Sequence, residues 1–205
     1  MLRAFSDVFG VDEGGSSISM AGRTDRWIVG QLAAKYGLPP DGDSLQRFHD
    51  SYIAHLSREI HNPGPRKGVL PGVRSLLELL AARDDAFLGL LTGNFEMGAR
   101  VKLEYFDLWR YFKCGAFGDR LEERNHLFDE AMTQALSCGA GPIDRSDVVI
   151  VGDTPLDVAV AVAGGARSLA VATGDYTADA LRAAGASAVL EDLSDERAVL
   201  KALGW

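Results

Sequence analysis

Cysteine is scarce in this sequence. Only two of the 205 residues are cysteines, Cys114 and Cys138, and neither stands in a Cys-x-x-Cys or Cys/His spacing. This excludes a disulfide framework and a structural zinc signature, and it fits a reducing compartment best. We therefore expect a cytoplasmic protein.

Long apolar runs are lacking as well. No segment reaches the roughly 18 apolar residues that a membrane span requires. The N-terminal stretch MLRAFSDVFGVDEGG also lacks the apolar run of a signal peptide. These absences predict a protein that is neither exported nor anchored in a membrane.

Positive charge is in short supply too. The formal net charge is -8, and the lysines and arginines are scattered rather than gathered into a basic stripe. This argues against nucleic acid as a partner. With 47% hydrophobic and 24% charged residues, the composition is that of a globular protein with one core, or one core and a small appended lobe.

The pattern of apolar residues divides the chain at residue 65. Residues 1–65 carry apolar side chains at helical intervals and are predicted to form a small helical domain, whose first helix is expected to begin at Met1. From residue 66 to residue 205, short β-type runs alternate with amphipathic helices. The predicted strands are 86–91, 113–117, 148–151, 168–172 and 186–190. The predicted helices between and after them are 73–82, 95–106, 124–137, 156–163, 178–184 and 196–203. Such alternation predicts a doubly wound α/β core with a mostly parallel sheet.

Two carboxylates gather at the tip of one predicted strand. The run 148–151 is followed by Gly152 and Asp153, and Asp157 lies four residues further on. Ligands of open α/β sheets bind beyond the carboxyl ends of the strands, and carboxylate oxygens suit Mg²⁺. The pair therefore predicts a magnesium site. The alternative is that Asp153 only caps the next helix, with Pro155 in its first turn.

A second strand also ends in small polar residues. The run 86–91 leads into Thr92, Gly93 and Asn94, at the start of the helix expected near Phe95. A hydroxyl group, together with the free amides and positive dipole end of that helix, would favour a phosphate. A simple helix cap is the alternative interpretation.

The two strand ends, in this order and about sixty residues apart, resemble motifs II and IV of the haloacid dehalogenase superfamily. The resemblance covers nearly the whole chain, and the helical first third is similar to the cap of phosphoglycolate phosphatase-like members. It implies that Thr92 binds phosphate through its hydroxyl, with Gly93 and Asn94 beside it. It also implies that Asp153 binds Mg²⁺, with Asp157 supporting the metal site. The implied substrate is a small phosphorylated metabolite.

The chain departs from the family pattern at motif III. The family places a lysine there, usually as Lys-Pro, and this sequence contains no Lys-Pro. Arg124 is the nearest equivalent, because it follows the predicted strand 113–117 and precedes a helix. Arginine keeps the charge and can grip phosphate oxygens in pairs. The alternative is a solvated residue at the start of a helix.

Motif I, which carries the family's nucleophile as Asp-x-Asp-x-Thr after a strand, is the second departure. Asp41 and Asp43 form an Asp-x-Asp, but a turn with glycine and proline precedes them, so they are expected to form a turn and a helix cap. The resemblance implies that the first core strand lies upstream of this chain and is central in the sheet, so that its absence would leave two neighbouring strands without a partner. The resemblance implies an aspartyl-phosphate intermediate whose nucleophile comes from that strand.

The cap would set substrate specificity. Arg23, within Gly22-Arg23-Thr24-Asp25, is the candidate for reading a second anion on the substrate, and an ordinary surface arginine is the alternative. The four histidines fit no metal or triad spacing and are expected to be structural. A non-catalytic phosphate-binding or protein-interaction relative stays open as a second function. A dehalogenase is disfavoured, because the metal-type motif is retained.

Overall fold

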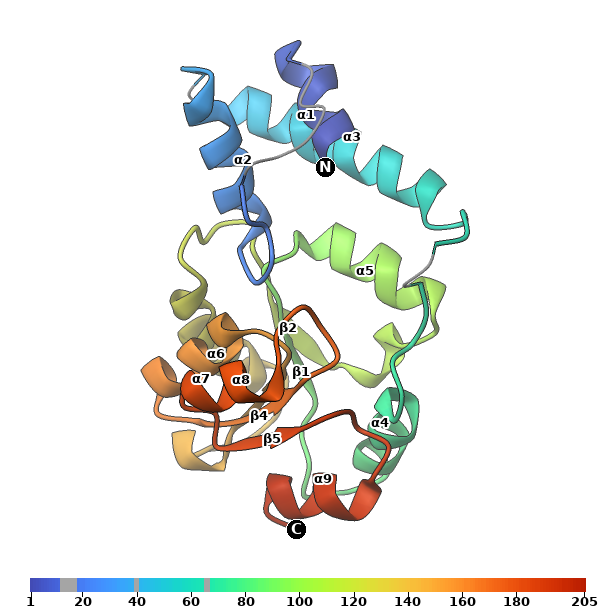
Figure 1. The fold of residues 1–205 in the computed structure, drawn as a ribbon, viewed down its shortest axis with the longest axis vertical. Helices are drawn as coiled ribbons and strands as arrows, with labels where there is room; N and C mark the ends of the chain where they lie inside the picture. Colours follow the sequence, from blue (N-terminus) through green and yellow to red (C-terminus); the bar gives the residue numbers. More distant parts are fainter. Residues whose placement is uncertain (12–17, 39–40, 65–66) are drawn as a thin grey trace. The chain divides into compact units, whose positions relative to one another are not determined.

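The computed structural model describes residues 1–11, 18–38, 41–64 and 67–205. The chain forms two units (Figure 1). The first unit comprises Met1–Lys67, Thr92–Trp109 and Phe117–Glu123. The second comprises Gly68–Leu91, Arg110–Ala116 and Arg124–Trp205. The predicted boundary at residues 65 and 66 lies outside the described residues, and that linear division stays a prediction.

The first unit is helical in its described parts. Its helices are α1 (Leu2–Phe9), α2 (Asp25–Lys35), α3 (Gly42–Glu59) and α5 (Glu96–Tyr105). They enclose a core of buried apolar side chains: Ala4, Phe5, Ile28, Val29, Leu32, Ala33, Phe48, Tyr52 and Phe95. Helix α1 begins at Leu2 with Met1 as its N-cap, one residue later than predicted. Asp41 caps α3 by accepting a hydrogen bond from the amide of Ser44 at 2.7 Å, which confirms the predicted cap.

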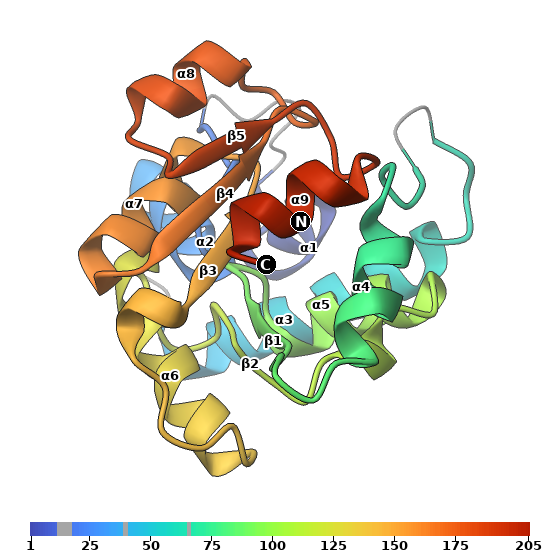
Figure 2. The ribbon, with the colours of Figure 1, turned by 90° about the horizontal axis from the view of Figure 1, so that it is seen from below.

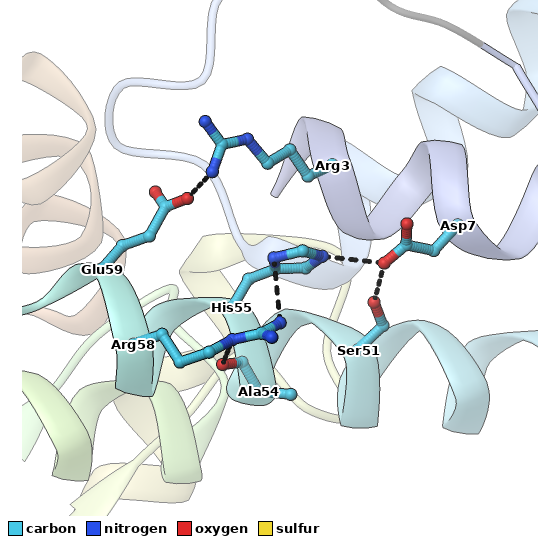
Figure 3. A network of polar contacts seen from close by, with 7 residues as sticks. All are labelled: Arg3, Asp7, Ser51, Ala54, His55, Arg58 and Glu59. Carbon is cyan, nitrogen blue, oxygen red and sulfur yellow. Dashed lines mark hydrogen bonds and ion pairs between the residues drawn. The ribbon is translucent and has the colours of Figure 1, made fainter.

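A polar network joins α1 to α3 on the surface of the first unit (Figure 3). The carboxylate of Asp7 accepts hydrogen bonds from the hydroxyl of Ser51 and from Nε2 of His55, both at 2.7 Å. Arg3 forms an ion pair with Glu59 one helical turn further along α3. His55 therefore has the structural role expected of it.

The hydrogen bonds from Ser51 and His55 lower the pKa of Asp7 below its ordinary value of 3.8. A carboxylate with a depressed folded pKa stabilises the fold above its unfolded pKa, and this contribution is lost as the pH falls through the folded pKa. Asp7→Asn is therefore expected to lower the thermal midpoint more at about pH 6 than at about pH 3. Circular dichroism melts at both pH values test this. An equal loss at both would contradict it.

The second unit is α/β, and its strands are parallel. They are β1 (Gly89–Leu91), β2 (Cys114–Ala116), β3 (Val149–Gly152), β4 (Arg167–Val171) and β5 (Ala188–Leu190). The helices are α4 (Val73–Ala81), α6 (Leu127–Ser137), α7 (Pro155–Gly164), α8 (Ala178–Ala183) and α9 (Glu196–Leu203). The predicted alternation of strands and helices is confirmed, although β1, β2 and β5 are shorter than their apolar runs.

Strand β4 shows why the fold is doubly wound. Leu169 and Val171 pack with side chains of α4 and α9, whereas Ala170 between them packs with α7 and α8. Successive side chains of a strand point to opposite faces of a sheet, so both faces here are covered by helices. The predicted fold class is confirmed.

Within the described residues, the strands form two separate sheets. One has the order β1-β2 and the other the order β3-β4-β5. The strand labels in Figure 2 run from β5 through β4 and β3 to β1 and β2. In β3, the side chain of Val151 is 44% exposed, which is unusual for a parallel strand. The expectation that two neighbouring strands of this core lack a partner stays a prediction.

Candidate functional site

The tip of β3 is built around the carboxylate of Asp157. Thr154 is the N-cap of α7 and Pro155 is its first residue. One oxygen of Asp157, Oδ2, accepts hydrogen bonds from the Thr154 amide at 3.0 Å, the Thr154 hydroxyl at 2.9 Å and the Asp153 amide at 3.2 Å. Thr154 and Asp157 thus form a capping box. Asp153 is not the cap of this helix, so that alternative interpretation of the motif is wrong.

Gly152 allows this close packing. A Cβ atom at Gly152 would overlap the Cβ, Cγ and Oδ2 atoms of Asp157, whose carboxylate is already fixed by its hydrogen bonds. Gly152→Ala is therefore expected to destabilise the protein by about 2 kcal/mol, as overpacking of a filled site does. Urea unfolding measures the loss. Gly42→Ala is the control, because a Cβ at Gly42 meets nothing within 4 Å; a loss as large in this control would contradict the steric explanation.

Arg124 is paired with the other oxygen of Asp157. Its Nη2 donates to Oδ1 of Asp157 at 2.5 Å, and the two side chains are only 14% and 10% exposed. Arg124 lies in a short 3-10 turn, Arg124–His126, so the predicted helix 124–137 begins as α6 only at Leu127. The interpretation of Arg124 as a solvated helix-start residue is therefore wrong.

The Nε donor of Arg124 does not take part in the pairing with Asp157. This Nε is buried and has no hydrogen-bond partner among the described residues. An unpaired buried N–H is costly, and such a group calls for an acceptor that completes the site. A negatively charged oxygen is the natural partner of a guanidinium donor.

Asp153 stands in an excess of negative charge. Burial raises the pKa of Asp153, and the neighbouring charges of Asp157 and Asp175 raise it further, while Arg124 opposes them. Gly174 lies so close to Asp153 that a Cβ there would overlap Oδ2 of the carboxylate. A half-buried carboxylate with acidic neighbours is a suitable ligand for a hard cation.

The sequence prediction missed the segment containing Gly174 and Asp175. A signal was present, because this segment follows β4, the parallel neighbour of β3, and the carboxyl ends of parallel neighbours meet at one edge of the sheet. Among the described residues, no three His, Cys, Asp or Glu side chains are grouped so as to hold a metal ion on their own. Mg²⁺ commonly takes only one or two protein carboxylates, with water and phosphate oxygens as its other ligands.

The Thr92–Asn94 turn belongs to the first unit. Oγ1 of Thr92 accepts a hydrogen bond from the amide of Asn94 at 3.2 Å, which leaves the hydroxyl proton available for donation. Oδ1 of Asn94 accepts from Nζ of Lys102 at 2.8 Å. The predicted polar turn after β1 is thus present, at the start of α5.

The first amides of α5 are not free, contrary to the prediction for a phosphate site. The amide of Phe95 donates to Asp25 Oδ2 at 2.9 Å, and the amide of Glu96 donates to Asp119 Oδ2 at 2.8 Å. Two carboxylates therefore occupy the donors expected to bind an anion. The prediction of free amides was wrong, because Asp25 lies 70 residues away in sequence and no local motif indicates its contact with Phe95.

Arg23 lies on the surface of the first unit. Its guanidinium stacks over the ring of Trp27, 4.6 Å from the centroid. Its role in reading a substrate anion stays a prediction. The structure thus brings Arg124, Asp153 and Asp157 together in the second unit, whereas Thr92, Gly93, Asn94 and Arg23 belong to the first.

Known proteins share this arrangement of elements. The profile of the HAD-hydrolase-like family, named after haloacid dehalogenase, matches residues 124–196, the segment that holds Arg124, Asp153 and Asp157. The phosphoglycolate phosphatase of Rhodospirillum rubrum is 32% identical over 181 residues, covering 85% of this chain and 71% of the relative.

Solved structures match the fold along nearly the whole chain. A hydrolase from Pseudomonas syringae superposes with a TM-score of 0.70 at 20% identity, covering 98% of this chain and 90% of that one. A predicted phosphoglycolate phosphatase from Haemophilus somnus superposes with a TM-score of 0.68 at 14% identity, covering 97% of this chain and 89% of that one.

In the described part of this chain, no helix has the length and apolar character needed to cross a membrane.

Proposed function

This chain belongs to the haloacid dehalogenase superfamily, and from that premise we propose that it is a phosphatase that hydrolyses a small phosphomonoester similar to phosphoglycolate. The observation that carries the proposal is the pairing of Arg124 with Asp157 beside Asp153. The cationic donor and the carboxylate that a phosphoryl site needs are thus held in one cluster. The buried Nε of Arg124 is a donor that a phosphate oxygen would satisfy.

Asp157 and Asp153 differ in what they can do. Both oxygens of Asp157 are engaged, one with Arg124 and one with the start of α7. In the proposal, Asp157 therefore positions Arg124 and the Asp153 segment, and Asp153 is the carboxylate that would hold Mg²⁺. When bound, Mg²⁺ would offset negative charge on the phosphoryl oxygens. The prediction that Asp157 also binds the metal directly stays a prediction.

The remaining predicted residues bind substrate in this proposal. The hydroxyl of Thr92 donates to the phosphoryl group, with Gly93 and Asn94 shaping the turn that presents it. Arg23 contacts a second anionic group of the substrate, such as a carboxylate. Donors that are fixed in place before the reaction stabilise the developing charge without reorganisation.

The proposal assigns the covalent step to a carboxylate upstream of Met1. There, one aspartate attacks phosphorus while a second aspartate gives its proton to the ester oxygen, which leaves as an alcohol. The second aspartate then takes a proton from water, and this water hydrolyses the aspartyl-phosphate to release inorganic phosphate and the free first aspartate. The separation of β1-β2 from β3-β4-β5 supports an additional strand in this core. The alternative is a non-catalytic phosphate-binding or protein-interaction relative, and the carboxylates that occupy the first amides of α5 favour its protein-interaction form.

Hydrolysis of p-nitrophenyl phosphate, with and without Mg²⁺, tests the proposal. The 205-residue chain is compared with a version extended to an upstream in-frame start. Mg²⁺-dependent hydrolysis by the extended version, lost on Arg124→Met, is the expected result. Two folded but inactive proteins that still bind inorganic phosphate would favour the non-catalytic alternative.

A further inference from the structure

Asp25 has a buried carboxylate that is hydrogen-bonded to the start of α5, far in sequence from its own helix α2. It is the first residue of α2 and only 3% exposed. Its helix does not use it as a cap, because the side chain of Thr24 accepts the hydrogen bond from the Trp27 amide at 3.1 Å. The Asp25 side chain instead accepts from the amide of Phe95 at 2.9 Å.

The same residue also holds the turn through its backbone. The amide of Asp25 donates to the carbonyl oxygen of Gly93 at 2.6 Å. One residue thus binds the Thr92–Asn94 turn at Gly93 and again at Phe95, directly after the turn. In Figure 1, the loops that precede α2 and α5 lie beside each other in accordance with these contacts.

A third segment, residues 118–122, is hydrogen-bonded to both the Thr92–Asn94 turn and the start of α2. The amide of Gly118 donates to the carbonyl oxygen of Asn94 at 2.8 Å, and the hydroxyl of Thr24 donates to the carbonyl oxygen of Glu122 at 2.9 Å. A Cβ at Gly118 would overlap the carbonyl group of Gly93 and lie 3.1 Å from Cβ of Thr24. The turn therefore has little freedom to move within the first unit.

These contacts reach the hydroxyl of Thr92 through Asn94. The amide of Asn94 donates a hydrogen bond to Oγ1 of Thr92 at 3.2 Å. Because this bond occupies one lone pair of Oγ1, it restricts the directions in which the Thr92 hydroxyl proton can point. The bonds from Asp25 fix the backbone on both sides of Asn94. A shift of Gly93 or Phe95 would therefore redirect the Thr92 donor.

We propose that Asp25 is a positioning residue, which holds the Thr92 hydroxyl in the orientation that donates to a phosphoryl oxygen. This inference rests on the proposed function, since it assigns a role within the same phosphate-binding turn. An apolar residue would fill a buried position at lower cost, because burying a carboxylate is unfavourable. Burial does raise the pKa of Asp25, with the Phe95 amide and Lys102 acting against it.

The test compares three variants of the full chain. Asp25→Ala removes the acceptor for the Phe95 amide, and Asp25→Asn keeps an acceptor oxygen of the same reach. Asp41→Ala is the matched control, because Asp41 is an exposed helix-capping carboxylate in the same unit. Binding of inorganic phosphate in the presence of Mg²⁺ is followed at the Thr92 and Gly93 amides by NMR titration. Hydrogen exchange of the Phe95 amide reports the bond to Asp25.

We expect Asp25→Ala to weaken phosphate binding about tenfold and to accelerate exchange at Phe95 by a similar factor, as leaving a buried donor without its acceptor does. Asp25→Asn should restore both, and Asp41→Ala should change neither. Should Asp25→Ala not fold, Asp25→Glu makes the same test, since it moves the carboxylate by one methylene group.

The outcomes distinguish the positioning role of Asp25 from the proposed function. Phosphate binding by Asp25→Ala as tight as that of the wild type would overturn the positioning role and leave the proposed function intact. The positioning role is also overturned if Asp41→Ala weakens binding as much as Asp25→Ala does. A wild-type chain whose Thr92 amide does not respond to phosphate would overturn the binding role of the turn, and the inference with it.

Discussion

Replacing Arg124 with methionine is expected to lower the free energy of unfolding by about 3 kcal/mol. The substitution keeps apolar bulk but leaves the carboxylate of Asp157 nearly buried without its cationic partner. Removing one member of a buried ion pair costs more than the pair contributes, because the remaining charge stays desolvated. Equilibrium unfolding in urea, followed by circular dichroism, gives the difference.

A surface pair in the same unit provides the control. Arg182 and Asp179 of α8 are 2.8 Å apart, and their side chains are 56% and 94% exposed. Arg182→Met is expected to cost less than about 1 kcal/mol, because water and side-chain entropy reduce the value of exposed pairs. If both substitutions cost the same, Arg124 does not hold Asp157 in the way inferred.

Asp153→Asn is expected to abolish the response of the protein to Mg²⁺ and to stabilise the metal-free protein. A ligand present at one hundred times its Kd stabilises the folded state by about 2.7 kcal/mol, a gain that the wild type should show and the variant should lack. In the absence of metal, asparagine removes one of the charges that crowd this strand tip. Such a trade between stability and activity is typical of residues retained for function.

Thermal melts at a series of Mg²⁺ concentrations measure both effects. Asp147→Asn is the control, because it removes one negative charge from an exposed position of the second unit. A variant at Asp153 that is stabilised by Mg²⁺ as strongly as the wild type would rule out this carboxylate as the metal ligand. A loss of stability without metal would show that Asp153 makes a contact that its surroundings do not suggest.

The sequence predicted the features that depend on local pattern. Apolar periodicity located the strands and helices of the second unit, and Thr154, Pro155 and Asp157 follow the spacing that is typical of a helix start. The Asp41 cap was likewise predictable from three neighbouring residues. At the two helix starts, the deciding contacts join residues no more than four positions apart.

The features that were missed depend on contacts between distant residues. Asp25 accepts a hydrogen bond from the Phe95 amide, 70 positions away in sequence. Arg124 donates a hydrogen bond to Asp157, 33 positions away. The local pattern at residues 92–94 therefore suggested free helix amides, and the pattern at Arg124 could not decide between burial and exposure. Only the fold determines which side chain satisfies a given donor.

The alternation of side chains along β4 couples the two faces of its sheet. Leu169 and Val171 belong to one apolar cluster and Ala170 to another, so a single five-residue backbone segment is shared by both. Loss of the strand would therefore remove buried side chains from both clusters at once. The second unit should therefore denature in one cooperative transition, with no state in which one layer of helices has melted and the other persists.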